Sequence, residues 1–284
     1  MTSSKRSGIS AFLRQVVQED WLSVAIDRHF NRKRPERWVV PDPTIHPSSL
    51  GSVCTLESEL GLLGHKTRIE GKTSRIFENG TSVGKRWVET FREMRILVSF
   101  ETPVVRDDPL VNGSVDVIVQ NSLTGEKSVG EIKSINSRGF RTLPSVTADR
   151  RGNMLALSAC SPWIRKYCLQ LTMYLTLSGL AGWFLFENKD TQEYKVFWVQ
   201  PTPEMRAECF DAGHPAVDAQ RAFYAGALVP PPFKQTSQQC KGCDRQRVCF
   251  SLQAGDEETW QIIQGQFRKA GQDPPQAWET ARRT

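Results

Sequence analysis

Two carboxylates and a lysine lie on a pair of predicted strands. Asp116 opens the strand 114–120, and Glu131 and Lys133 close the strand 127–135. Residues two apart in a strand point to the same side, so Glu131 and Lys133 project together. In a hairpin the start of the first strand lies beside the end of the second. Asp116 therefore neighbours Glu131 if the register places both on one face, and the turn sequence leaves that register open.

Adjacent carboxylates repel each other unless a positive charge lies between them. Mg²⁺ or Mn²⁺ is the natural candidate, because hard cations take oxygen ligands. Such an ion lowers the pKa of a bound water and withdraws charge from a phosphate. Asp116, Glu131 and the backbone carbonyl of Ile132 are the expected ligands, and Lys133 can stabilise charge on the phosphate. The alternative is a surface hairpin that carries scattered charges.

Three further residues extend this pattern. Gln170 and Tyr174 lie four apart in a predicted helix, so they share one face; the alternative is two polar residues on an exposed face. Glu101, in the strand that precedes Asp116, is a possible additional acid, against simple exposure at a strand end.

The order Asp116, Glu131-x-Lys133 and Gln170-x-x-x-Tyr174 resembles the motifs of RecB-like nucleases in the PD-(D/E)xK superfamily. In that family the glutamine and tyrosine line the active site and help to position DNA or the catalytic groups. The resemblance spans residues 45–252. It implies a central mixed sheet flanked by helices and an Mg²⁺- or Mn²⁺-dependent deoxyribonuclease, with an exonuclease on single strands or DNA ends favoured over an endonuclease.

Three of the seven cysteines fall within ten residues: Cys240, Cys243 and Cys249. An odd number of cysteines argues against a disulfide framework. Three thiolates need a fourth ligand to complete an iron–sulfur cluster or a zinc site. The spacing is similar to that of the CRISPR-associated RecB-like exonucleases and AddB-type nucleases, and this resemblance implies Cys54 as the fourth ligand of a 4Fe–4S cluster. A zinc site on the same cysteines is the alternative.

One position departs from the family pattern. The histidine that usually precedes the first catalytic strand corresponds to Gly84, and His65 is a remote substitute. This departure favours an alternative function, a catalytically weakened DNA-binding or complex-assembly module of the same fold. A third alternative is a zinc-stabilised binding protein without catalysis.

Composition bounds the class of protein. The 284 residues carry a net charge of +6 with a pI near 9.0, which fits DNA as a partner and equally fits a solvated basic face. We find no apolar stretch long enough for a membrane span and no signal-peptide core at the start, so we expect a cytoplasmic protein that binds no membrane. Recombination, phage DNA processing and CRISPR adaptation all supply candidate protein partners. The basic clusters are Arg28, Arg32, Lys33, Arg34 and Arg37, then Arg138, Arg141, Arg150 and Arg151.

Interleaved strands and helices predict an α/β fold. The expected organisation is an N-terminal helical and basic extension over 1–44, a nuclease domain over 45–255 that includes the cluster cysteines, and a C-terminal tail over 256–284. The iron–sulfur region is expected to join the two ends of the nuclease domain. Helices are predicted at 11–17, 21–30, 73–94, 161–180 and 203–228, and strands at 96–105, 114–120, 127–135, 182–187 and 194–200.

Overall fold

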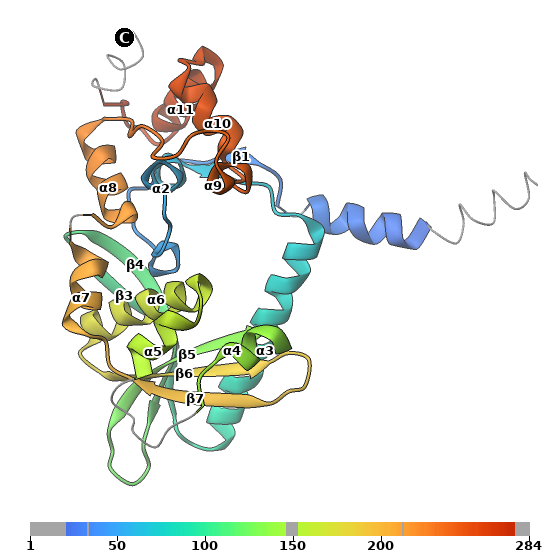
Figure 1. Ribbon diagram of the computed structural model, residues 1–284, viewed down its shortest axis with the longest axis vertical. Coiled ribbons are helices and arrows are strands. Elements are labelled where there is room, and N and C mark those ends of the chain that lie inside the picture. Colours follow the sequence, from blue (N-terminus) through green and yellow to red (C-terminus); the bar gives the residue numbers. More distant parts are fainter. Residues whose placement is uncertain (1–20, 33, 146–152, 212, 276–284) are drawn as a thin grey trace, which may run out of the picture.

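The computed structural model describes residues 21–32, 34–145, 153–211 and 213–275. The predicted helix at 11–17, together with Lys33, Arg150 and Arg151, lies outside these ranges. Residues 21–32 are helical, as predicted, and extend away from the rest of the chain (Figure 1).

A five-stranded sheet forms the centre of the molecule, in the order β3-β4-β5-β6-β7. Adjacent strands are antiparallel except β5 and β6, which are parallel. The sheet is therefore mixed, and together with its flanking helices it confirms the predicted α/β class. The strands are β3 (Leu97–Asp107), β4 (Leu110–Gln120), β5 (Lys127–Ile135), β6 (Ala181–Asn188) and β7 (Tyr194–Val199).

A parallel pair needs a crossover connection, and three helices supply it between β5 and β6. They are α4 (Ser137–Thr142), α5 (Asn153–Cys160) and α6 (Pro162–Ser178). The Ser161 side chain caps the start of α6, and Gly179 ends the helix in the left-handed conformation that glycine tolerates. The sequence thus fixes both ends of the helix that carries Gln170 and Tyr174.

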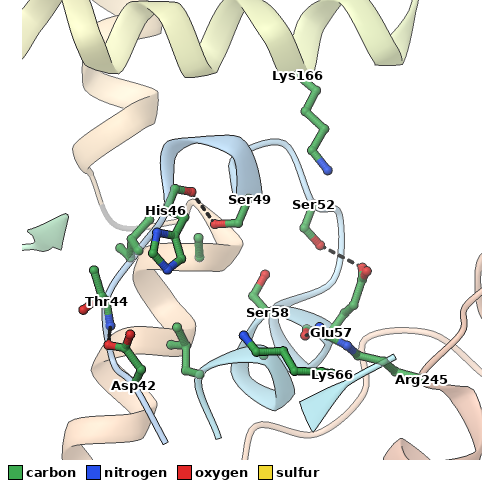
Figure 2. A pocket seen from close by; sticks show the side chains of 14 residues that line it. Asp42, Thr44, His46, Ser49, Ser52, Glu57, Ser58, Lys66, Lys166 and Arg245 are labelled. Carbon is green, nitrogen blue, oxygen red and sulfur yellow. Dashed lines mark hydrogen bonds between the residues drawn. The ribbon is translucent and has the colours of Figure 1, made fainter. Parts of the chain in front are cut away.

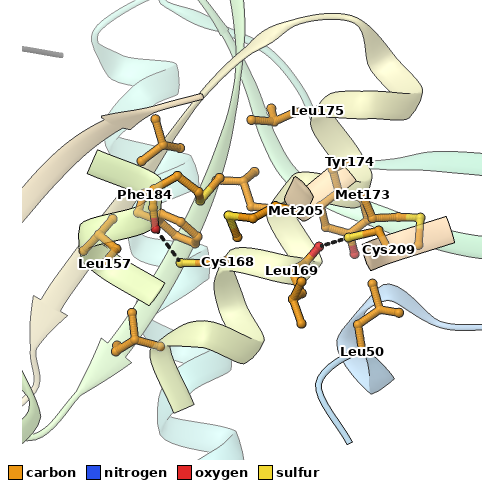
Figure 3. Packing of buried hydrophobic residues seen from close by; sticks show 14 of the residues in the cluster. Leu50, Leu157, Cys168, Leu169, Met173, Tyr174, Leu175, Phe184, Met205 and Cys209 are labelled. Carbon is orange, nitrogen blue, oxygen red and sulfur yellow. Dashed lines mark hydrogen bonds between the residues drawn. The ribbon is translucent and has the colours of Figure 1, made fainter. Parts of the chain in front are cut away.

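Helices cover both faces of the sheet (Figure 1). On one face, α5, α6 and α7 (Pro203–Phe210) pack on β5 and β6 through side chains such as Leu157, Met205 and Phe184 (Figure 3). On the other face, α3 (Gly71–Glu93) packs through Val83 and Phe91. Because β5 alternates between these two cores, its odd-numbered residues near the end face α6 and its even-numbered residues face α3.

A second, smaller core joins the two ends of the chain. It contains α2 (Thr55–Leu62), α10 (Gln246–Gln253) and α11 (Glu257–Lys269), near the two-stranded sheet of β1 (Arg37–Trp38) and β2 (His65–Lys66). Trp260, Ile263 and Phe267 of α11 are buried there, so the segment expected as a C-terminal tail begins with a packed helix. The remaining elements are η1 (Pro47–Ser49), α8 (Pro215–Ala225) and α9 (Gln238–Lys241).

The predicted helix over 203–228 is two helices, α7 and α8. Asp211 ends the first in an extended conformation, and His214 caps the second through its side chain, so the chain turns between them. Among the described residues, no helix is both long and apolar enough to cross a membrane.

Candidate active site and cysteine cavity

The hairpin of β4 and β5 brings the two predicted carboxylates together. Val117 pairs with Gly130, so Asp116 comes next along the ladder, against Glu131. The backbone amide of Ile132 donates a hydrogen bond to Oδ2 of Asp116 at 2.8 Å. The amide and carbonyl of one strand residue point to the same edge of the strand, so the Ile132 carbonyl also faces β4. The turn sequence left the register open, and the observed register places Asp116 beside Glu131.

Glu101 adjoins the same point from the other side. Phe100 pairs with Val117 and Thr102 with Val115, which leaves Glu101 opposite Asp116. Its φ of 46° is positive, a conformation that costs a residue with a side chain about 1–3 kcal/mol and persists where the surroundings impose it. The Glu101 charge contributes to a raised pKa of Asp116, after the larger effect of burial. The structure therefore groups this additional acid with the other two.

Glu131 is fully buried, and its two oxygens differ. Lys133 Nζ donates a hydrogen bond to Oε1, whereas Oε2 has no partner within the described part of the chain. Burial, followed by the charge of Asp116, raises the pKa of Glu131 to about 7. Burial likewise raises the pKa of Asp116. Two buried acids thus lie side by side, and the charge of Lys133 acts on both.

Lys133 connects the acids to α6. Burial lowers the pKa of its ammonium group, but Glu131 and Asp116 act in the opposite direction and the net pKa is raised. Its Nζ lies 3.5 Å from Oε1 of Gln170 and 4.8 Å from the centre of the Tyr167 ring. These contacts hold a charged ammonium group beside the carboxylates at neutral pH.

The polar pair of α6 completes the group. Gln170 Nε2 donates to the Tyr174 hydroxyl at 3.4 Å, and both side chains are buried. Burial, with the charge of Glu131, raises the pKa of the Tyr174 phenol to about 12. All the predicted site residues of the sheet and of α6 therefore lie in one cluster.

This cluster fits a divalent cation. Its donors are carboxylate oxygens and a backbone carbonyl, the ligands that Mg²⁺ and Mn²⁺ prefer. The unpartnered Oε2 of Glu131 is a buried acceptor that a cation would satisfy, since a buried polar atom without a partner is costly. Across the described ranges, no three His, Cys, Asp or Glu side chains are already arranged around a common point as metal ligands.

Neither Gly84, at the position where similar nucleases have a histidine, nor His65 adds a ligand to this cluster. A Cβ atom on Gly84, in the middle of α3, would meet nothing within 4 Å, so the helix presents open space there. His65 is fully buried in β2, where Nε2 lies 3.2 Å from Glu36 Oε1 and the ring packs on Trp38 at 4.9 Å. These contacts account for His65 as a core residue of the smaller sheet.

The four cysteines line a single cavity between α2, α9 and α10. Cys54 caps the start of α2, and Cys240, Cys243 and Cys249 come from the C-terminal part of the chain. All four are free thiols. Burial raises the pKa of Cys249 to about 12, and the other three sulfur atoms add to that rise, so they are electrostatic neighbours. The structure thus brings Cys54 to the three clustered cysteines, across most of the chain.

Two features of these regions were missed from the sequence. Arg245 also lines the cysteine cavity, and its guanidinium donates to the backbone carbonyls of Glu57 and His65. A neighbouring polar pocket contains Arg245, Lys66 and Lys166 (Figure 2). The run Cys243-Asp-Arg245 was the available signal, because an arginine beside clustered thiols supplies positive charge and hydrogen bonds.

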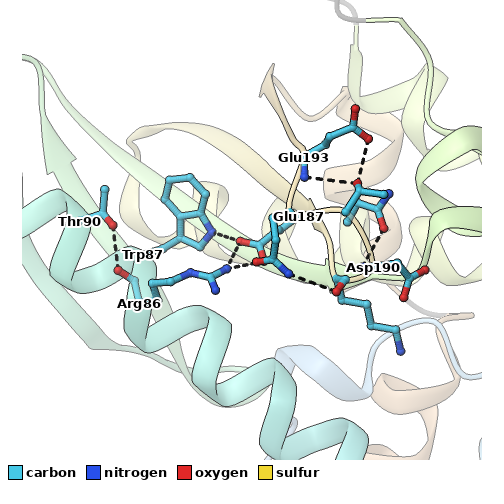
Figure 4. Close-up of polar contacts among 10 residues, drawn as sticks. Arg86, Trp87, Thr90, Glu187, Asp190 and Glu193 are labelled. Atoms are coloured by element: carbon cyan, nitrogen blue, oxygen red, sulfur yellow. Dashed lines mark hydrogen bonds and ion pairs between the residues drawn. The ribbon is translucent and has the colours of Figure 1, made fainter.

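An ion pair between the exposed Arg86 and the buried Glu187 fastens α3 to the sheet (Figure 4). Glu187 of β6 is 1% exposed and accepts hydrogen bonds from Arg86 and from Trp87 Nε1, the latter at 2.7 Å. Both carboxylate oxygens bind Arg86. This network is satisfied by its own partners, which accounts for Glu187 as a structural residue.

Comparison with known proteins identifies no family. No family model and no curated protein matches the chain. Among solved structures, the crystal structure of SSO0001 is similar over 82% of this chain and 96% of that one, with 15% sequence identity and a TM-score of 0.39. A similarity of that size carries no argument about function.

Proposed function

We propose that this chain is a metal-dependent deoxyribonuclease with a PD-(D/E)xK core, acting as an exonuclease on single strands or DNA ends. The observation that carries the proposal is the state of Glu131. It is fully buried against a second acid, with one oxygen bound by Lys133 and the other without a partner. Burial of such a pair is costly and typical of functional sites.

Asp116, Glu131 and the Ile132 carbonyl would hold Mg²⁺ or Mn²⁺, with Glu101 available as a further acid. When bound, the ion supplies charge neutralisation at the phosphate and a water of lowered pKa. The raised pKa of Lys133 keeps its ammonium group protonated at neutral pH, so it acts by hydrogen bonding and charge rather than as a base. Gln170 and Tyr174 position Lys133 from α6.

We further propose that Cys54, Cys240, Cys243 and Cys249 hold a 4Fe–4S cluster. Four free thiols around one cavity supply the soft ligands that such a cluster needs. Its role would be to tie α2 to α9 and α10. Zinc on the same four sulfurs is the competing occupant.

The test is cleavage of end-labelled single- and double-stranded DNA with Mg²⁺ or Mn²⁺, by protein purified without oxygen. Wild type is compared with Lys133→Ala and with Glu93→Gln, which removes an exposed carboxylate at the end of α3. We expect metal-dependent degradation by wild type and Glu93→Gln and none by Lys133→Ala. Equal degradation by all three proteins would assign the activity to a contaminant and overturn the proposal.

The second candidate is a weakened module that binds DNA without cutting it. Gly84 favours it, because α3 offers no imidazole at the position where similar nucleases have one. Under this alternative, wild type and Lys133→Ala bind DNA equally and neither degrades it with either metal.

A further inference from the structure

One face of α6 carries a stripe of aromatic and polar side chains. Trp163, Tyr167, Gln170 and Tyr174 are spaced four, three and four residues apart, which keeps them on one side of the helix. The stripe begins in the first turn, directly after the Ser161 cap. Trp163 is about 10 Å along the helix axis from Gln170, given the rise of an α-helix.

Exposure along this stripe changes in one direction. Trp163 is 71% exposed, Tyr167 is half-buried, and Gln170 and Tyr174 are buried. Packing explains the inner two residues, but it does not explain a tryptophan that leaves most of its large apolar surface in water. The stripe therefore starts in solvent and ends at the carboxylate cluster.

Tyr167 lies between the exposed end of the stripe and the carboxylate cluster. Its ring centre lies 4.8 Å from Lys133 Nζ, and Lys133 in turn donates to Glu131. The partly buried ring thus borders the ammonium group that faces the acids. A planar ligand that covers Trp163 and Tyr167 would therefore extend toward these acids.

Basic side chains lie at the same edge of the sheet as the exposed end of the stripe. β5 ends where α4 begins, and α6 runs back toward the start of β6, so the first turn of α6 lies at the same edge of the sheet as the end of β5. Arg138 and Arg141 of α4 are exposed, and Lys166 extends from α6 into the polar pocket (Figure 2). Basic side chains near aromatic rings are the combination that binds single-stranded nucleic acid.

We propose that Trp163 and Tyr167 stack on successive unpaired bases of a single DNA strand and guide that strand to the carboxylates. This inference rests on the proposed function, because it takes DNA as the ligand. It makes single strands the preferred substrate, since bases inside a duplex are already stacked on each other and offer no free face.

The test measures binding without cleavage, with Ca²⁺ in place of Mg²⁺ and Mn²⁺, by fluorescence anisotropy of the full-length chain. The labelled probes are an oligothymidylate, a strand of the same length with abasic sites, and a blunt duplex. We expect Trp163→Ala to weaken binding of oligothymidylate about ten-fold, the effect of losing one stacked base. Binding of the abasic strand and of the duplex should stay unchanged, because neither offers an unpaired base to Trp163.

Two variants make the result specific. Trp163→Phe keeps an aromatic face and should restore most of the affinity. Tyr224→Ala removes an aromatic side chain that is 60% exposed on α8, and it should leave binding of all three probes unaltered. Equal losses on all three probes, or no loss on oligothymidylate, would overturn the stacking assignment. Loss of base-dependent binding without any nuclease activity in wild type would support the stacking site and reject the proposed reaction.

Discussion

The carboxylate cluster and the cysteine cavity are built in opposite ways. The carboxylates come from neighbouring strands, and the helix that follows them adds Gln170 and Tyr174, so strand pairing and the crossover position the cluster. The cysteines come from α2 and from short helices near the other end of the chain, and between them lies the entire sheet. Ladder hydrogen bonds hold the first group, whereas side-chain packing in the smaller core holds the second.

Under the proposed function, this difference separates two kinds of metal dependence. A site fixed by a sheet keeps its geometry with or without an ion, so the ion serves the reaction. A site assembled from distant segments gains its cohesion from what binds there, because closing a long loop is costly in chain entropy. We therefore expect changes in the carboxylates to affect activity, and changes in the cysteines to affect stability.

The largest effect is expected from Asp116→Asn. The amide oxygen can still accept the hydrogen bond from Ile132, so the fold is kept while the charge that would bind metal is lost. We expect cleavage to fall at least about 1,000-fold, the scale of losing a principal electrostatic group. The midpoint of urea unfolding without metal should not fall, because burial already disfavours the charged form of this acid. A variant that is equally inactive but markedly less stable would contradict the separation of roles.

Cys249→Ser is expected to show the opposite pattern. Loss of one ligand should remove the cluster and lower the free energy of unfolding by about 2–4 kcal/mol, the typical value of a cross-link. Iron and sulfide content, zinc content and urea unfolding provide the measurements. Cys160→Ser is the control, since Cys160 is a half-buried thiol at the end of α5, outside the cavity. If wild type contains zinc and no iron, the iron–sulfur assignment is wrong, and the four cysteines cross-link the chain through zinc instead.

The third effect depends on pH and concerns Glu59, a buried acid of the smaller core. Its Oε2 accepts a hydrogen bond from the Val229 amide at 2.9 Å, and burial raises its pKa to about 8. The folded state therefore retains a proton that the unfolded chain releases between about pH 4.5 and 8. The stabilising effect is complete below this range and is lost as the pH rises through it, by up to about 1.4 kcal/mol per pH unit.

Glu59→Gln removes this dependence, because the amide keeps the hydrogen-bond acceptor and carries no charge. We expect the variant to gain stability relative to wild type between pH 5 and pH 8 in urea unfolding, whereas Glu93→Gln should show no such gain. Parallel pH curves for wild type and Glu59→Gln would mean that water reaches this carboxylate.

Sequence patterns predicted much of the sheet and its connections. Alternation of Val115, Val117 and Val119 indicated a strand, and turn residues indicated both hairpins. Helical spacing placed Gln170 and Tyr174 on one face, and their contacts with each other and with Lys133 confirm that face. Local periodicity was sufficient because each of these features depends on residues close in sequence.

Long-range packing could not be predicted in the same way. The parallel pairing of β5 with β6 depends on a crossover whose length does not specify the partner strand. The positive φ of Glu101 has no signal in a residue type that seldom adopts it. Trp260, Ile263 and Phe267 had helical spacing, yet only the smaller core explains why the last helix is folded against the chain.

The uninterrupted helix α3 gives the molecule a mechanical element. Its 23 residues extend about 34 Å, from the region of β2 down to the sheet, where Glu187 fastens it (Figure 1). A continuous helix keeps its length under thermal motion, because its backbone hydrogen bonds fix the rise of each residue. α3 therefore fixes the distance between the region of β2 and the point on the sheet where Glu187 binds Arg86.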